Sequence, residues 1–247
     1  MNSYEVFILA GGLGTRLRSV VKDVPKPMAE VQGEPFLAHL MRYWVGQGIG
    51  RITLSVGYLG DQIRDFFGDS FQGVPISYAI EKERLGTGGA VLAYLRKRKD
   101  VCPAGLFIVN GDTFFPINVN EMLASCERSG AGLCIAAFRS VDSARYDKLI
   151  VDENLQLVSI GARQQPSGPK MNKETIFLAN GGVYFLRDDL LDLNHYPSGP
   201  TSLEEAIIPQ IAAESRGVHV LENKVPFIDI GVPEDYSMAQ GFNFSCD

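Results

Sequence analysis

Short apolar runs and amphipathic segments alternate along the first 110 residues. Runs rich in β-branched and aromatic residues predict buried strands at 4–9, 51–56, 75–80 and 105–109. Between them, apolar positions at helical spacing predict helices at 35–47, 59–67 and 87–97. Strands that alternate with helices at such short intervals imply an α/β fold with a doubly wound, mainly parallel, Rossmann-like sheet.

The pattern becomes β-rich further along the chain. It predicts a helix at 118–128, a strand at 132–138, a hairpin around 152–154, a polar loop at 164–173, a strand at 176–186, a helix at 202–214, a short strand at 227–230 and a helix at 233–242. We expect one domain over 1–247, with a core at 1–138, a β-rich lobe at 139–232 and a terminal helix at 233–247. No hexapeptide repeat predicts a C-terminal β-helix.

A glycine-rich loop follows the first predicted strand. It contains Gly11, Gly12 and Gly14, and the cations Arg16 and Lys26 come soon after. Glycines let backbone N–H groups approach a ligand closely, and N–H groups with nearby cations suit phosphate oxygens. We interpret this stretch as a cradle for a nucleoside triphosphate. For the glycines alone, an ordinary strand-to-helix turn is the alternative, and the dinucleotide and P-loop fingerprints are both incomplete.

Two aspartates, Asp112 and Asp229, follow or lie within predicted apolar strands. Asp112 follows the apolar run at 105–109, and Asp229 lies between two isoleucines. Ligands of doubly wound sheets bind at the carboxyl ends of strands, where the glycine loop, Glu81 and Asp112 all fall. A carboxylate buried without a cation or donors is unfavourable, and Mg²⁺ prefers oxygen ligands. The two aspartates are therefore candidate Mg²⁺ ligands; for Asp112 alone, a plain N-G-D turn is the alternative.

Composition narrows the classes of function. The 247 residues carry a net charge of −6, which argues against non-specific nucleic-acid binding. The four cysteines show no metal-binding spacing, and we expect reduced thiols. No apolar run approaches the ~20 residues that span a bilayer, and no leader-like segment precedes the first strand. We expect a cytoplasmic protein. The three histidines are scattered and receive no catalytic role.

The string LAGGLGTRL followed by KDVPKPM resembles the sugar-phosphate nucleotidylyltransferases. The resemblance covers essentially the whole chain. It implies Mg²⁺-assisted attack of a sugar 1-phosphate on the α-phosphate of a nucleoside triphosphate, with release of pyrophosphate. Arg16 would then hold the leaving pyrophosphate and Lys26 the α-phosphate. The family's paired metal ligands fall on Asp112 and Asp229.

The resemblance also implies binding residues. The segment EKERLGTGG resembles the family's nucleobase segment, in which Glu81 is suited to guanine; we interpret Lys82, Glu83 and Arg84 as a solvent-exposed charge cluster. The implied nucleotide-binding residues are Leu9, Ala10, Gly11, Gly12, Gly14, Thr15, Glu81, Gly86 and Thr87. The segment NGGVY resembles the family's sugar-binding strand, so the β-rich lobe would bind the sugar. The implied sugar-phosphate residues are Asn110, Gly111, Arg163, Asn180, Gly181 and Glu204.

Two of these positions carry alternatives. We expect the Glu204 carboxylate to accept hydrogen bonds from a vicinal diol of the sugar, although an acid in the first turn of a helix is also typical. Where family members often have a Glu-Lys pair, this chain has Ala162 and Arg163. Arginine still clamps phosphate, and the change hints at a distinct substrate subgroup.

Within the family, LAGGLGTRLRSVV, LSVGY and LGTGGA resemble most the members that use GTP and a manno-heptose 1-phosphate, for capsule or surface glycan. Members that use mannose 1-phosphate with GTP, or glucose 1-phosphate with a thymidine or cytidine nucleotide, are the near alternatives. A non-catalytic subunit that binds nucleotide sugars is an alternative of another class, and a dinucleotide-dependent oxidoreductase is a more remote one. A homo-oligomer is compatible with the sequence.

Overall fold

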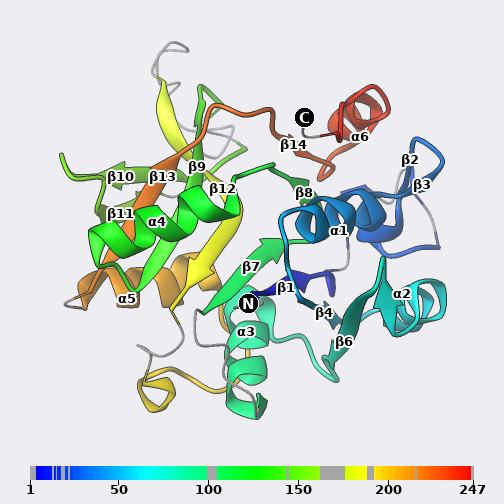
Figure 1. The fold of residues 1–247 in the computed structure, drawn as a ribbon, viewed down its shortest axis with the longest axis horizontal. Coiled ribbons are helices and arrows are strands. Elements are labelled where there is room, and N and C mark those ends of the chain that lie inside the picture. The colour runs from blue at the N-terminus through cyan, green and yellow to red at the C-terminus, as the bar shows by residue number, and fades with distance from the viewer. Residues whose placement is uncertain are drawn as a thin grey trace.

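A ten-stranded sheet forms the centre of the described chain (Figure 1). The computed structural model describes residues 4–245 except 13, 15, 18–19, 22, 99–104, 143–144, 162–175, 188–191 and 215. Eight strands follow one path, in the spatial order β11 (Leu157–Gly161), β10 (Lys148–Val151), β12 (Phe177–Leu186), β7 (Leu106–Asn110), β1 (Glu5–Leu9), β4 (Arg51–Val56), β6 (Val74–Ile80) and β5 (Ser70–Phe71). Two further strands, β9 (Leu133–Ser140) and β13 (Val218–Glu222), continue the sheet beside β12.

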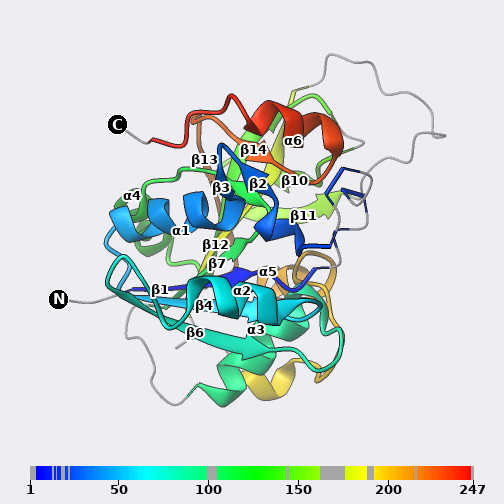
Figure 2. The ribbon, with the colours of Figure 1, turned by 90° about the vertical axis from the view of Figure 1, so that its right-hand side faces the viewer.

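The half of the sheet built from the first 110 residues is parallel. β7, β1, β4 and β6 pair in parallel register. Successive side chains of β1 point to opposite faces, so Val6 and Ile8 pack in one core and Phe7 in another. Helices cover both faces (Figure 2). One face carries α1 (Phe36–Gly46), α2 (Gly60–Phe67) and α4 (Val119–Ser129), and the other carries α3 (Gly86–Lys97) and α5 (Ile208–Ala213). The predicted doubly wound fold is confirmed.

β12 joins the two halves of the sheet. On one side, its C-terminal part pairs antiparallel with β7 and its N-terminal part with β10, and on the other side both parts pair antiparallel with β9. Between Asn180 and Tyr184 the register against β9 shifts, because these five residues of β12 lie opposite only three residues of β9, Ala137 to Ile135. Gly182 within this bulge has φ +69°, a conformation that favours glycine. Bulges commonly re-aim side chains next to functional sites, and this one lies within the NGGVY segment.

Several local predictions are confirmed. The hairpin around 152–154 forms between β10 and β11. The side chain of Ser202 accepts a hydrogen bond from Glu205 N at 3.1 Å, as its capping spacing predicts. The helix that follows begins with a π-helical turn, Leu203–Ile207, and continues as α5. α6 (Pro233–Ala239) is shorter than its predicted range.

Other elements were not predicted. β13 pairs parallel with β9, although its five residues gave no clear periodic signal. Two small two-stranded sheets also form, from β2 (Glu30–Val31) with β3 (Glu34–Pro35) and from β8 (Thr113–Phe114) with β14 (Ile228–Asp229). Of these four strands, β14 was predicted, as the short strand at 227–230. Strands this short form only because they pair with a partner strand in the folded protein. The loop expected at 164–173 lies outside the described residues.

The longest of the described α-helices, α3, has 12 residues. None of these helices has both the length and the apolar character needed to cross a bilayer. Cys126 and Cys134 are buried free thiols, and burial raises the pKa of Cys126 to about 11. The other two cysteines lie outside the described residues.

Candidate functional site

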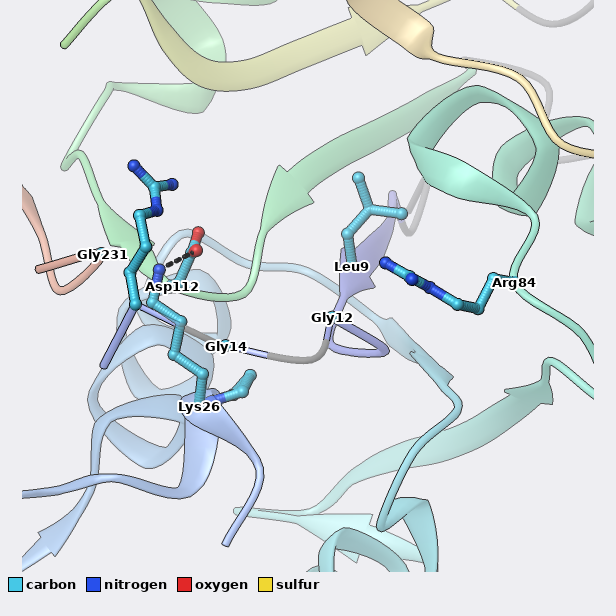
Figure 3. Close-up of a pocket in the computed structure, with 9 residues that line it drawn as sticks. Leu9, Gly12, Gly14, Lys26, Arg84, Asp112 and Gly231 are labelled. Atoms are coloured by element: carbon cyan, nitrogen blue, oxygen red, sulfur yellow. Dashed lines mark hydrogen bonds and ion pairs between the residues drawn. The ribbon is translucent and has the colours of Figure 1, made fainter. Parts of the chain in front are cut away.

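The glycine loop lies at the carboxyl end of β1 and packs against Lys26. Gly14 has φ +58°, and a Cβ atom there would lie 2.8 Å from the Lys26 Cβ. Lys26 lies between Pro25 and Pro27 and is the first residue of a short 3₁₀ turn, Lys26–Met28. Its side chain is only 9% exposed and points at Asp112 (Figure 3). The absence of a side chain at Gly14 therefore leaves room for the base of the Lys26 side chain beside the loop.

A two-stranded ladder brings the two candidate metal ligands together. Asp112 follows β7, and the next residue, Thr113, pairs with Asp229 in β14. Ile230 N donates to the Asp112 carbonyl at 3.0 Å. The Lys26 ammonium forms an ion pair with Asp112 and lies 3.8 Å from Asp229 Oδ1. Two aspartates that are distant in sequence thus share one cation.

The electrostatics of this trio follow from burial and charge. Burial opposes ionisation of Asp112, but the charge and hydrogen bond of Lys26 outweigh it and lower the pKa of Asp112. Burial and the nearby negative charge of Asp112 raise the pKa of Asp229. Gly231 N donates to Asp229 Oδ1 at 2.6 Å and fixes that carboxyl group. The arrangement is a pair of carboxylates with the positive charge of Lys26 beside both.

Two adjoining hollows lie along the glycine loop, and we call them together the loop cavity. One is shown in Figure 3, where Arg84 approaches Leu9 and Gly12 from the side opposite Lys26. The loop cavity is lined by Leu9, Gly11, Gly12, Gly14, Arg16, Lys26, Pro27, Glu81, Arg84, Gly86, Thr87, Asn110, Asp112 and Gly231. Exposed glycine backbone and three cationic side chains make this cavity suited to an anionic, phosphate-bearing ligand.

A second cavity, the lobe cavity, lies between the parallel half of the sheet and the β-rich lobe. Its volume is about 400 Å³. It is lined by Arg16, Asn110, Asp112, Thr113, Arg145, Tyr146, Asp147, Asn180, Gly181, Gly182, Glu204, Phe227, Asp229, Val232 and Glu234. Acceptor and donor side chains line it together with two aromatic rings, as is typical of sites for polyhydroxylated ligands. Arg16, Asn110 and Asp112 line both cavities, so the two sites meet at these residues.

Glu81 is held at the base of the loop cavity. Its Oε1 accepts from Ser55 Oγ at 2.8 Å, and its Oε2 accepts from Leu85 N at 3.3 Å. A Cβ atom at Gly11 would lie 2.8 Å from Glu81 Oε1, so the glycine loop passes directly beside the carboxylate. An acceptor held in this way suits a ligand that presents N–H donors.

The structure brings most of the candidate site residues to the two cavities. Ala10 and Gly111 are buried instead: Ala10 N donates to Ser55 O at 2.9 Å and Gly111 N to Leu9 O at 3.0 Å. A Cβ atom at Gly111 would lie 2.7 Å from Leu9 O, which explains the glycine by packing. Thr15 and Arg163 lie outside the described residues, as does Ala162.

Some residues that line the cavities were missed or misinterpreted. Arg84 is exposed, as predicted for its charge cluster, but that it also lines the loop cavity opposite Lys26 was missed. Arg145 lines the lobe cavity, and its guanidinium group forms a bidentate ion pair with Asp235 of α6. Tyr146 and Phe227 form an aromatic wall, with ring centroids 5.6 Å apart. Arg84 stands within the predicted nucleobase segment and Phe227 two residues before Asp229, whereas no sequence signal pointed to Arg145 or Tyr146.

Comparison with known proteins identifies the family. A family model described as Nucleotidyl transferase matches residues 5–244. This chain belongs to the nucleotidyl transferase family. D-glycero-alpha-D-manno-heptose 1-phosphate guanylyltransferases of Campylobacter jejuni and Aneurinibacillus thermoaerophilus are relatives of this nucleotidyl transferase. The first is 36% identical, covering 94% of this chain and 96% of the relative. The second is 33% identical, covering 96% of each.

Solved structures agree with this assignment. HddC from Yersinia pseudotuberculosis, solved in complex with GMP-PN, superposes on this nucleotidyl transferase with a TM-score of 0.80. It is 33% identical, and the match covers 96% of this chain and 98% of HddC. A putative glucose-1-phosphate thymidylyltransferase from Bacillus anthracis has a TM-score of 0.79 at 18% identity, which demonstrates a shared fold alone.

Proposed function

We propose that this nucleotidyl transferase is a guanylyltransferase that converts GTP and D-glycero-α-D-manno-heptose 1-phosphate into GDP-heptose and pyrophosphate. The observation that carries the proposal is the meeting of the two cavities at Arg16, Asn110 and Asp112. A nucleotide in the loop cavity and a sugar phosphate in the lobe cavity would place their phosphates beside the same residues. The names of two relatives at 36% and 33% identity support the choice of heptose and GTP.

The chemistry of this transfer requires alignment more than acid–base catalysis. The attacking oxygen belongs to a phosphate that is already anionic, so no strong general base is needed. Charge accumulates on the phosphates as the bond to pyrophosphate breaks. Lys26 would stabilise the α-phosphate, and Arg16, which faces both cavities, would hold the leaving pyrophosphate. Arg84 adds a third cation on the far side of the loop cavity.

Asp112 and Asp229 fit a Mg²⁺ ion. Lys26 already places a cation within 4 Å of both carboxylates, which shows that their field favours positive charge. No group of three or more His, Cys, Asp or Glu side chains forms a metal-ligand set among the described residues. Mg²⁺ usually takes one or two protein carboxylates and completes its shell with water and substrate phosphates. When bound, the ion would neutralise charge on the phosphates.

The base preference is proposed to come from Glu81. Guanine presents its N1–H and its 2-amino group along one edge, and both are donors to a carboxylate. Thymine lacks the amino group. Ser55 and Leu85 N each occupy one acceptor position of Glu81 and leave other lone pairs for the base. Mannose-1-phosphate guanylyltransferases, at 26–28% identity, are also named as guanylyltransferases. Mannose 1-phosphate is therefore the alternative sugar substrate.

The experiment is a matrix of pyrophosphate release with Mg²⁺, four nucleoside triphosphates and a panel of sugar 1-phosphates that includes the manno-heptose. Turnover with GTP and the heptose, abolished by EDTA and by Asp112→Asn, supports the proposal. Asp61→Asn is the matched control, because the Asp61 side chain is 89% exposed on α2. Turnover with another pair of substrates contradicts the heptose or the GTP. Nucleotide binding without any turnover would favour a non-catalytic subunit.

We also infer a cytoplasmic location and a product used for a surface glycan such as capsule polysaccharide, since cytoplasmic GTP would be the donor. Deletion of the gene would then remove the heptose from the glycan. Retention of the heptose in the glycan of the deletion strain contradicts this inference.

A further inference from the structure

The Glu204 carboxylate is surrounded by three hydroxyl groups. Tyr184 Oη donates to Glu204 Oε1 at 3.0 Å. Thr87 Oγ1 donates to Glu204 Oε2 at 2.8 Å, and Ser202 Oγ donates to the same oxygen at 3.1 Å. These donors come from β12, from the first turn of α3 and from the residue that caps the π-helical turn. Three separate parts of the chain therefore converge on one carboxylate of the lobe cavity.

The polarity of these hydrogen bonds is fixed. Each hydroxyl has a single proton, and each also accepts from a nitrogen that can only donate. Asn180 Nδ2 donates to Tyr184 Oη at 2.9 Å, and Leu203 N donates to Thr87 Oγ1 at 2.8 Å. Glu205 N donates to Ser202 Oγ in the cap described above. All three protons consequently point at Glu204, and Tyr184 is fully buried with no freedom to turn elsewhere.

The LGTGG segment packs closely against residues 199–203, which lead directly to Glu204. Gly88 N and Gly89 N donate to the Thr201 carbonyl at 2.9 and 3.0 Å. A Cβ atom at Gly86 would lie 2.7 Å from Thr201 O, and one at Gly89 would lie 2.5 Å from Gly199 O. These glycines permit the close packing of 199–203 against α3. The segment that borders the loop cavity is thus joined rigidly to the sugar-facing carboxylate.

We propose that Thr87 and Tyr184 are positioning residues that hold Glu204 for the sugar, and that Thr87 links the nucleotide segment to sugar recognition. This rests on the proposed function of the two cavities. An ionised carboxylate offers about four lone-pair sites, and three are occupied here. Glu204 therefore has room for one sugar hydroxyl on Oε1, which revises the expected contact with a vicinal diol.

The test compares Thr87→Val, Thr87→Ser and Tyr184→Phe by steady-state kinetics, with the sugar 1-phosphate and GTP varied in turn. Thr87→Val and Tyr184→Phe should each raise KM for the sugar phosphate about tenfold, the scale of a lost hydrogen bond to a charged group. Tyr184 lines neither cavity, so Tyr184→Phe should leave KM for GTP unchanged. Thr87→Ser keeps the hydroxyl and should restore the wild-type KM. Tyr196→Phe is the control, since buried Tyr196 donates to Glu214 away from both cavities.

The outcomes separate this inference from the proposed function. If the wild-type enzyme turns over a different sugar phosphate, the same comparison is made with that substrate. The proposed function is then wrong about the heptose, and the inference about Glu204 is still tested. A Thr87→Val enzyme with an unchanged sugar KM overturns the inference. So does an equal rise of both KM values in Tyr184→Phe, or failure of Thr87→Ser to rescue, because either would indicate general damage to the packing around Glu204. If Thr87→Val does not fold, Tyr184→Phe against Tyr196→Phe decides alone.

Discussion

Gly14 and Lys26 are packed so closely that a Cβ atom on Gly14 would lie 2.8 Å from the Lys26 Cβ. Gly14 also has φ +58°, a backbone conformation that is strained for any residue with a Cβ atom. The third glycine of the loop thus serves the placement of a side chain as well as the exposure of backbone N–H groups. The same Lys26 side chain carries the ammonium group that pairs with Asp112 and lies 3.8 Å from Asp229 Oδ1.

Gly14→Ala should therefore lower activity more than stability. The left-handed conformation costs about 1–2 kcal/mol for alanine, and the Lys26 side chain must also shift. We expect kcat to fall more than tenfold. Gly48→Ala is the matched control, because Gly48 has φ +83° with no atom within 4 Å of the added Cβ. The control should lose similar stability in thermal unfolding and keep its kcat; equal kcat values for the two variants would refute the packing argument.

Lys26→Ala should reduce kcat by about 10²–10³, the scale of removing one preorganised donor to a developing charge. KM for GTP should change much less, since Arg16, Arg84 and the loop backbone remain to bind phosphate. Initial rates of pyrophosphate release measure both constants. Lys224→Ala, at an exposed position, is the control for loss of a positive charge. Near-normal turnover of Lys26→Ala would remove Lys26 from the mechanism.

Arg145 and Asp235 should behave as a coupled pair in sugar binding. Their bidentate hydrogen bond raises the pKa of Arg145 and ties the lobe to α6 beside the lobe cavity. Arg145→Lys and Asp235→Asn should each raise KM for the sugar phosphate several-fold, because lysine cannot reproduce the planar fork. A double-mutant cycle should show that the two effects do not add. Additive effects would mean that the ion pair plays no part in shaping the cavity.

The surface pair Glu34–Arg42 should make a pH-dependent contribution to stability. The hydrogen bond from Arg42 lowers the pKa of Glu34 below its usual 4.5. A lowered pKa in the folded state stabilises the fold above the unfolded value, and this contribution is lost as pH falls through the folded pKa. Glu34→Gln should be less stable than wild type at pH 7 by about 1 kcal/mol or less. Chemical denaturation at pH 7 and pH 3.5 should show that gap closing; a constant gap would contradict the linkage.

The sequence determined the parallel half of the fold, because its signals are local. Buried strands such as β1 are continuous apolar runs, and α1 and α2 carry apolar positions at helical spacing. Because ligands of doubly wound sheets bind at the carboxyl ends of strands, the order of the elements alone predicts that the glycine loop, Glu81 and Asp112 share one edge of the sheet. The cap at Ser202 was equally local, since it depends on a side chain and a backbone group three residues apart.

Only the tertiary structure decided features that depend on distant partners. The pairing of β14 with β8 brings Asp229 beside Asp112, and no local pattern encodes that register. The bulge in β12 and the close packing of LGTGG arise from contacts with β9 and with residues 199–203. Arg84 is a solvent-exposed charge, as predicted, but its place beside the loop cavity depends on residues from other segments. Periodicity reports which face of an element is buried, whereas the neighbour that buries it is chosen by long-range packing.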